Sequence, residues 1–273
     1  MRVYEDDLRN EVRVRLKEDL DSFYQEDFLN YEGSTLDSKK KLTEVIADEL
    51  VKNYDQVSKI GKNADIRRTR SFNRNHDGVA NVKARMWRFG NLEYNEKLLA
   101  IALYNSRQGY CLGEIFDYEV PIKEKQTDKY GRVDLVSKDR LNHSVKLIEL
   151  KIKPENGNGE TLLRALLEIY TYYKLISGSF DKFLRDYSLL PAEYLQFQPA
   201  MLVEEETLSG KTLSDLKKHP RIETLIARMT NEIGMRVEGY VFDYPRKIKP
   251  FQSSGEDKQK IMLQGNISIE QII

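Results

Sequence analysis

Apolar residues recur at helical intervals along the first part of the chain. Segments 5–29 and 36–58 both show the three- and four-residue spacing of an amphipathic helix. In the second segment, one face carries Leu42, Val45, Ile46, Glu49 and Leu50. Residues 61–78 are polar and rich in arginine without a clear period, and they predict a loop or a short helix.

From residue 91 onward, helical segments alternate with short strand-like runs. A helix is predicted from about residue 91 to about residue 107, and a second helix from residue 160 to about residue 177. Between them lie three runs with strand character, Glu114–Ile122, Gly131–Val136 and Ser144–Ile152. Further along, the pattern predicts a strand at 198–205, a helix at 213–233 that breaks or restarts at Pro220, and a strand at 235–244.

The predicted order from residue 91 is therefore α-β-β-β-α-β-α-β. This order predicts an α/β domain with a mixed central sheet and helices on its faces. The 273 residues are enough for one substantial domain or two small ones. We expect a helical extension at residues 1–90, the α/β core at 91–245, and a tail at 246–273 that is polar and loosely held as far as Ile261.

The charge is balanced over the chain but unevenly placed. Its 44 basic and 44 acidic side chains give a formal net charge of zero, which argues against a protein that coats DNA. A basic stretch at residues 62–88 includes Arg67, Arg68 and Arg70, and such a stretch can neutralise phosphates of a nucleic acid. The alternative interpretation is a solvated surface that balances the acidic N-terminal helix.

The cysteine and histidine residues exclude several kinds of site. Cys111 is the sole cysteine, so no intrachain disulfide forms, which fits a cytoplasmic protein. A small buried hydrophobe is the favoured role for it. The three histidines are scattered and offer no zinc spacing with one cysteine. No run of about eighteen apolar residues occurs, and we expect no membrane span.

Candidate chemistry lies on the second and third strand-like runs. Side chains alternate along a strand, so Glu149 and Lys151 share one face, while Leu150 and Ile152 point the other way into a core. A hairpin between the two runs can bring Asp134 beside Glu149. Two carboxylates can hold a divalent cation such as Mg²⁺. A neighbouring lysine can orient a water molecule. The two carboxylates, the cation and the lysine are together the parts needed to hydrolyse a phosphodiester.

A third carboxylate belongs to the helix before these strands. Glu96 lies on one stripe with Leu92, Leu99 and Leu103, and a buried unpaired carboxylate is costly. It therefore needs a cation or hydrogen bonds. The alternative is that Glu96 merely stabilises the helix N-terminus. For Asp134, Glu149 and Lys151 the alternative is an exposed strand face with a cross-strand charge pair.

Asp134 and the Glu149-x-Lys151 triplet, set in this element order, resemble the PD-(D/E)XK nuclease superfamily. The resemblance covers about residues 91–243 and implies a restriction-endonuclease-like core, α-β-β-β-α-β, with the N-terminal helices as an extension. It also implies that Asp134 and Glu149 bind Mg²⁺ or Mn²⁺, that Lys151 orients the attacking water, and that Glu96 completes the metal shell.

The helix after the third strand adds a second point of resemblance. RecB-type nucleases of this superfamily carry a Gln-x-x-x-Tyr motif there, and Glu168 and Tyr172 occupy the matching positions. Glu replaces Gln, so this side chain has no amide donor and could accept from Lys151. Arg164 lies one turn earlier on the same stripe and could contact a phosphate. The tyrosines could equally be packing residues.

The resemblance implies a metal-dependent nuclease of a RecB-like, exonuclease subgroup, acting on nucleic acid and most plausibly on DNA. A partner protein or a second copy of the chain could take part. Two other functions remain open. The same fold could serve as a catalytically silent module for nucleic-acid binding or assembly, or the chain could be an ordinary α/β interaction protein.

Overall fold

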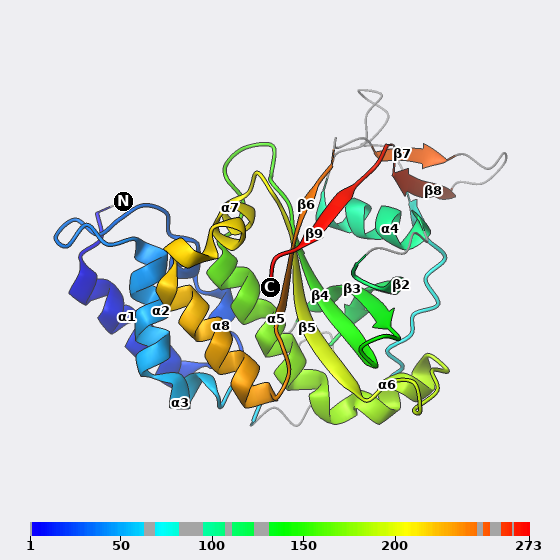
Figure 1. Ribbon diagram of the computed structural model, residues 1–273, viewed down its shortest axis with the longest axis horizontal. Coiled ribbons are helices and arrows are strands. Elements are labelled where there is room, and N and C mark those ends of the chain that lie inside the picture. The colour runs from blue at the N-terminus through cyan, green and yellow to red at the C-terminus, as the bar shows by residue number, and fades with distance from the viewer. Residues whose placement is uncertain are drawn as a thin grey trace.

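A mixed six-stranded sheet forms the centre of the molecule (Figure 1). The computed structural model describes residues 2–62, 69–81, 95–106, 111–122, 131–244, 248–251, 258–263 and 265–273. The strands, in their order across the sheet, are β2 (Glu114–Pro121), β3 (Arg132–Asp139), β4 (Ser144–Lys151), β5 (Gln196–Glu204), β6 (Glu238–Asp243) and β9 (Ser268–Gln271).

The first three strands form an antiparallel meander, and β5 and β6 continue the sheet in parallel with β4. A parallel pair needs a crossover connection. Helices α5 (Leu162–Ile176) and α6 (Phe180–Asp186) supply it between β4 and β5, and α7 (Leu208–Ser214) and α8 (Pro220–Ile233) supply it between β5 and β6. Strand β4 is buried at every residue, as expected for a strand covered on both faces.

Helices cover both faces of the sheet (Figure 1). One face carries α5 and α8 with the N-terminal helices α1 (Glu5–Glu18), α2 (Leu42–Lys52) and α3 (Tyr54–Val57). The other carries α4 (Glu96–Ser106) and a small sheet of β1 (Val79–Asn81), β8 (Lys258–Leu263) and β7 (Ile248–Phe251).

The alternation along β4 divides its side chains between two apolar clusters. Val145 and Leu147 belong to the cluster that contains the buried residues of α5 and the N-terminal helices. Ile148, Leu150 and Ile152 belong to the cluster that contains α4. By the same period of two, Glu149 and Lys151 lie on the α5 side, and the predicted inward direction of Leu150 and Ile152 is confirmed.

The N-terminal helices are joined to each other by a buried charge network. Glu49 on α2 is buried and accepts hydrogen bonds from Arg9 and Arg13 on α1, at 3.1 Å and 2.5 Å. This pairing explains how a glutamate can occupy the apolar face of α2. Helix α2 packs on α8, where Arg228 donates to the Val51 carbonyl at 2.9 Å. The division of the chain at residues 90 and 245 stays a prediction.

The structure agrees with the predicted α/β class and refines several elements. The segment 5–29 is helical only to Glu18 and then forms 3₁₀ turns at Phe23–Gln25 and Asp27–Asn30. The predicted helix at 213–233 is in fact α7, a 3₁₀ turn and α8, and it restarts at Pro220 as predicted, because proline suits the first helical position.

The expectation of a loosely held segment as far as Ile261 is wrong for its described residues. Strands β7 and β8 pair with each other, and β9 pairs with β6. These strands are short, and the other partner of β8 is the distant strand β1, so local pattern did not reveal them. Within the described ranges no helix has the length and apolar character needed to cross a membrane.

Gly113 offers a test of the close approach between β2 and β3. Its φ is +87°, and a Cβ at this position would lie 2.6 Å from the Lys138 carbonyl oxygen. We expect Gly113→Ala to lower the free energy of unfolding by about 2 kcal/mol or more, through backbone strain and steric clash. The matched control is Gly178→Ala, which would meet nothing within 4 Å. Urea denaturation measures both, and equal effects would contradict the argument.

Candidate functional site

A buried lysine forms the centre of the candidate site. Lys151 ends β4 and is 5% exposed. Its Nζ lies 2.7 Å from Glu149 Oε1, 2.9 Å from Glu160 Oε2 and 3.0 Å from Glu168 Oε2. Burial by itself lowers the pKa of Lys151, but the surrounding carboxylates outweigh it and hold that pKa well above its usual value. Lys151 is therefore a fixed positive charge.

The hairpin between β3 and β4 brings Asp134 to this lysine. Leu135 pairs with Ile148, so continuing the antiparallel register by one residue sets Asp134 opposite Glu149. The Leu150 N–H donates to Asp134 Oδ2 at 2.9 Å. Burial raises the pKa of Asp134 to about 7, with the charges of Glu96 and Glu168 adding to the effect. The predicted neighbourhood of Asp134 and Glu149 is thus found in the structure.

Glu149 has one satisfied and one unsatisfied oxygen. The side chain is 3% exposed, and Oε1 accepts from Lys151 while Oε2 is buried without a hydrogen-bond partner. Burial, followed by the charges of Asp134 and Glu168, raises the pKa of Glu149 well above its usual value. An exposed strand face, the alternative interpretation from the sequence, does not describe this side chain.

Glu96 reaches the same cluster from the first turn of α4. Burial raises its pKa, the charge of Lys151 and the Ile152 N–H oppose the rise, and the charge of Glu160 adds to it. Glu96 and Glu160 also line an open cleft of about 700 Å³, which is walled by the loop Pro154–Gly159 and by Glu32. Two of the carboxylates around Lys151, Glu96 and Glu160, therefore border the solvent-filled cleft.

Glu168 and Tyr172 face the lysine, as their spacing predicts. The Tyr172 hydroxyl donates to Glu168 Oε1 at 2.7 Å, and Glu168 Oε2 accepts from Lys151 at 3.0 Å. Although burial opposes ionisation, Lys151 and the Tyr172 hydroxyl hold the pKa of Glu168 below its usual value. Gly131 leaves room for the tyrosine, because a Cβ there would lie 2.2 Å from the Tyr172 hydroxyl oxygen.

A second buried lysine on the same strand provides an internal comparison. Lys146 Nζ lies 3.0 Å from Asp139 Oδ2, 2.9 Å from Glu238 Oε2 and 2.8 Å from the Tyr240 hydroxyl. Burial opposes ionisation of Asp139 here too, yet hydrogen bonds from Lys146 and Asn142 hold its pKa below the usual value. At the Lys146 end of β4, two carboxylates thus pair with one lysine, and the pKa of Asp139 stays low.

The Lys151 end carries more negative charge than one lysine neutralises. Five carboxylates interact with this ammonium, and they are Glu96, Asp134, Glu149, Glu160 and Glu168. In contrast to Asp139, the pKa is raised at three of them, Asp134, Glu149 and Glu96. A protein can relieve such an excess by protonating carboxyls or by binding a cation.

The oxygen donors fit a hard divalent cation, but they do not form a finished cage. Among the residues that the structure describes, no three His, Cys, Asp or Glu side chains are grouped closely enough to hold a metal ion as they stand. The carboxylates are instead drawn toward Lys151. Asp134 and Glu149 remain the residues whose oxygens fit such an ion best, because Glu149 Oε2 has no donor.

The predicted basic residues are placed differently. Arg164 forms an ion pair with Glu160, with its Nε 3.2 Å from Glu160 Oε1. Arg67 and Arg68 lie outside the described residues. Arg70 is exposed and precedes Phe72, whose N–H donates to Asp186 at the end of α6. This anchor lies beyond the C-terminal end of α5, whereas Lys151 contacts its N-terminal half.

Two residues of the site escaped sequence reasoning. Glu160 lies four and eight residues before Arg164 and Glu168, so its helical stripe was a usable signal. Tyr24 packs edge-to-face on Tyr172, with ring centroids 5.5 Å apart. It comes from a 3₁₀ turn of the N-terminal segment, and no local pattern connects it with α5.

Comparison of the chain with protein-family models, with curated proteins and with solved structures finds no match. The function is therefore argued from the arrangement around Lys151.

The raised pKa of Asp134 predicts an unusual pH dependence of stability without metal. The folded state holds a proton on Asp134 up to about pH 7, whereas the unfolded carboxyl loses it near 3.8. Stability from this group is present below the unfolded pKa and is lost as the pH rises toward 7. We expect Asp134→Asn, which cannot ionise, to become more stable than the wild type as the pH rises through this interval.

Asp139→Asn is the matched control, because the pKa of Asp139 is lowered and its contribution has the opposite sign. This variant should be less stable than the wild type at neutral pH, and the difference should shrink on acidification. Urea denaturation in chelator at a series of pH values measures both. A parallel pH profile for the wild type and Asp134→Asn would contradict the prediction.

Proposed function

We propose that the chain is a metal-dependent nuclease of the PD-(D/E)XK type, with a restriction-endonuclease-like core of the RecB-like, exonuclease subgroup. One observation carries the proposal: Asp134, Glu149 and Lys151 meet at the end of a hairpin beside an open cleft, with more buried carboxylate than the lysine neutralises. The order α4-β2-β3-β4-α5-β5 supports the proposed core.

In this proposal Asp134 and Glu149 would hold Mg²⁺ or Mn²⁺, with Glu96 adding an oxygen from α4. When bound, such an ion supplies Lewis-acid polarisation of the phosphate and lowers the pKa of a bound water. Because the pKa values of Asp134 and Glu149 are raised in the metal-free protein, both carboxyls would release protons as they become ligands.

Lys151 would orient the attacking water and stabilise negative charge that develops on the phosphate. Glu168 positions the ammonium, and Tyr172 positions Glu168. Because the pKa of Glu168 is lowered beside the lysine, Glu168 would keep Lys151 charged if Glu149 served as a metal ligand. The proposed substrate is DNA, which would enter through the cleft beside the loop Pro154–Gly159.

The second candidate is a catalytically silent module of the same fold that binds nucleic acid or supports an assembly. Two observations favour it. Three carboxylates form ion pairs with Lys151, and among the described residues no three potential ligands are grouped closely enough to hold a metal ion. In that case the cluster would be a structural ion network like the one around Lys146.

Metal binding can be measured without any nuclease assay. We expect calorimetry to show Mg²⁺ or Mn²⁺ binding to the wild type, with a heat that depends on the ionisation enthalpy of the buffer because protons are released. Asp134→Asn should lose this binding. Asp139→Asn should keep it, since Asp139 lies at the Lys146 end of β4, away from the proposed ligands. Wild type that binds neither ion would count against the nuclease.

Cleavage distinguishes the two candidates. With Mg²⁺ or Mn²⁺, we expect the wild type to cut DNA, tested as linear and circular, single- and double-stranded substrates. Glu149→Gln and Lys151→Gln should lower the rate by about a hundredfold or more while leaving affinity for DNA nearly intact. Thermal unfolding checks that each variant is folded. If Lys151→Gln does not fold, Glu168→Gln replaces it as a milder change.

Asp139→Asn is again the control and should cut at the wild-type rate wherever it is folded. A metal-loaded wild type that binds nucleic acid but cuts no form of it would favour the silent module. A protein that neither binds nor cuts would remove both candidates.

A further inference from the structure

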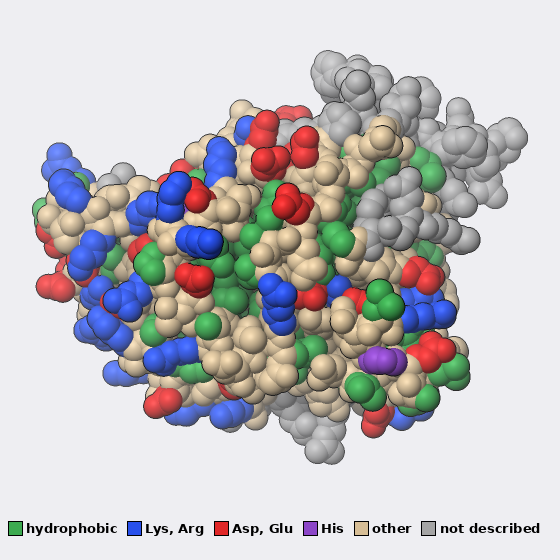
Figure 2. All heavy atoms as spheres, in the orientation of Figure 1, with side chains coloured by type: hydrophobic (Ala, Val, Ile, Leu, Met, Phe, Trp, Pro, Cys, Tyr) green, Lys and Arg blue, Asp and Glu red, His purple; other side chains and the backbone are tan. Residues whose placement is uncertain are grey.

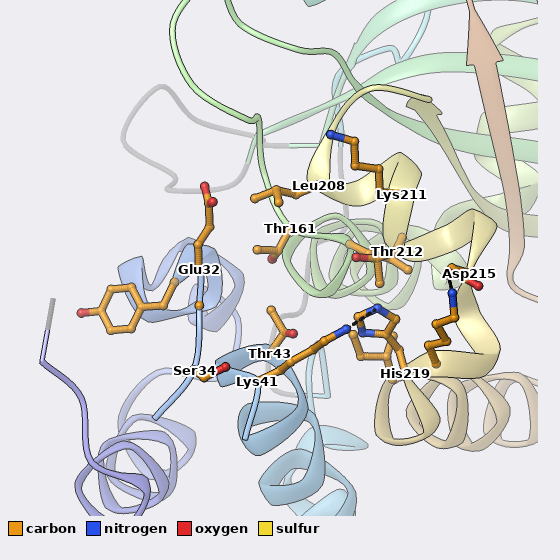
Figure 3. Close-up of a pocket in the computed structure, with 15 residues that line it drawn as sticks. Glu32, Ser34, Lys41, Thr43, Thr161, Leu208, Lys211, Thr212, Asp215 and His219 are labelled. Carbon is orange, nitrogen blue, oxygen red and sulfur yellow. Dashed lines mark hydrogen bonds and ion pairs between the residues drawn. The ribbon is translucent and has the colours of Figure 1, made fainter. Parts of the chain in front are cut away.

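A second pocket, of about 440 Å³, lies on the N-terminal helical side of the molecule (Figure 3). Its walls come from the loop at residues 31–34, from α7, and from the first residues of α2, α5 and α8. In Figure 2, Lys and Arg side chains gather over the N-terminal helices and α8 (left). The pocket contains none of the residues around Lys151.

Three long helices begin at this pocket. The residues that precede them are Lys41 for α2, Thr161 for α5 and His219 for α8. A helix N-terminus presents free backbone N–H groups and a partial positive charge, and both favour an anion. Thr161 caps α5 with its own hydroxyl, and Glu44 accepts from the Arg221 N–H in the first turn of α8 at 3.0 Å, whereas α2 begins without a side-chain cap.

Lysine side chains reinforce this positive field. Lys41 and Lys211 line the pocket and form no ion pair with a carboxylate among the described residues, whereas Lys218 pairs with Asp215. Glu32, the other acidic residue of the lining, accepts a hydrogen bond from Asn158 Nδ2 at 2.9 Å. The two carboxylates of the pocket are thus already engaged.

His219 is a buried side chain with one ring nitrogen engaged and one without a hydrogen-bond partner. It is 8% exposed, and its Nδ1 has no hydrogen bond, with Glu44 Oε1 3.8 Å away. Its Nε2 accepts a hydrogen bond from Lys41 Nζ at 3.3 Å (Figure 3). Burial, and then the charge of Lys41, lower the pKa of His219. An anion beside Lys41 would offset both effects.

We infer that this pocket binds a phosphate group of a nucleic-acid strand. Lys41 and Lys211 would contact the phosphate oxygens, and the side chains of Thr43 and Thr212 line the same space (Figure 3). A phosphate offers three acceptor oxygens, which matches several separate donors better than a carboxylate does. Apolar walls from Leu162 and Ile222 leave room for a sugar or base.

The pocket adjoins the cleft beside Glu96. Glu32 lines both, and its bond to Asn158 forms part of the wall between them. A strand with one phosphate at the carboxylates would therefore extend toward the pocket. The choice of a strand as the source of the phosphate rests on the proposed function, whereas the phosphate site itself does not.

Binding in chelator, where no cleavage occurs, tests the inference. The probes are inorganic phosphate, followed by calorimetry, and a fluorescent oligothymidylate, followed by anisotropy. We expect phosphate to bind and to compete with the oligonucleotide. Lys41→Ala and Lys211→Ala should each weaken both probes by about tenfold, since each removes a charge-assisted hydrogen bond, and should flatten the salt dependence of oligonucleotide binding.

Lys217→Ala is the control, because Lys217 is exposed, neighbours Lys218 and lies outside the pocket lining. It should bind both probes like the wild type. Equal losses in Lys217→Ala and the pocket variants, or no phosphate binding, would overturn the inference. Phosphate that binds without displacing the oligonucleotide would overturn the strand as its source.

The two proposals fail separately. If the pocket variants lose affinity but the wild type cuts no DNA with Mg²⁺ or Mn²⁺, the phosphate pocket stands and the nuclease falls. If the wild type cuts DNA and the pocket variants bind and cut normally, the nuclease stands and the pocket inference is wrong.

Discussion

The candidate site depends on one interaction, the ion pairing of a buried lysine with carboxylates from three parts of the chain. Lys151 could not remain charged in this position alone, because desolvation disfavours the ammonium. Glu149 on its own strand, Glu160 before α5 and Glu168 on α5 keep it charged. In doing so they bring more negative charge to the end of β4 than the lysine removes. The pKa of Asp134 and of Glu149 is raised there, whereas the pKa of Asp139 beside Lys146 is lowered.

Sequence pattern predicted the parts of the site that follow from local geometry. Strand alternation placed Glu149 and Lys151 on one face, and the four-residue helical spacing aligned Glu168 with Tyr172. The hairpin that joins Asp134 to Glu149 needed only a polar turn between two apolar runs. Each of these inferences uses neighbours within one element or one hairpin, where the backbone period fixes direction.

The contacts that sequence could not supply are long-range. Tyr24 contacts Tyr172 although the two residues lie far apart in the sequence, and no local pattern indicates that β9 pairs with β6. The N-terminal helices also proved to be part of the main apolar cluster. Their loop residue Glu32 joins the wall between cleft and pocket, so this layer helps to shape both concave surfaces.

The crossover between β4 and β5 has a consequence for how the molecule folds. Lys151 pairs in register with Val203, and α5 lies between these strands in the chain. Such non-local pairing closes late, because loop entropy must be overcome first. Until then Asp134 stays in water and ionises as an ordinary carboxyl. Refolding at weakly acidic pH should therefore draw a proton from solution as the crossover docks, and a pH indicator dye would time that docking without any label on the protein.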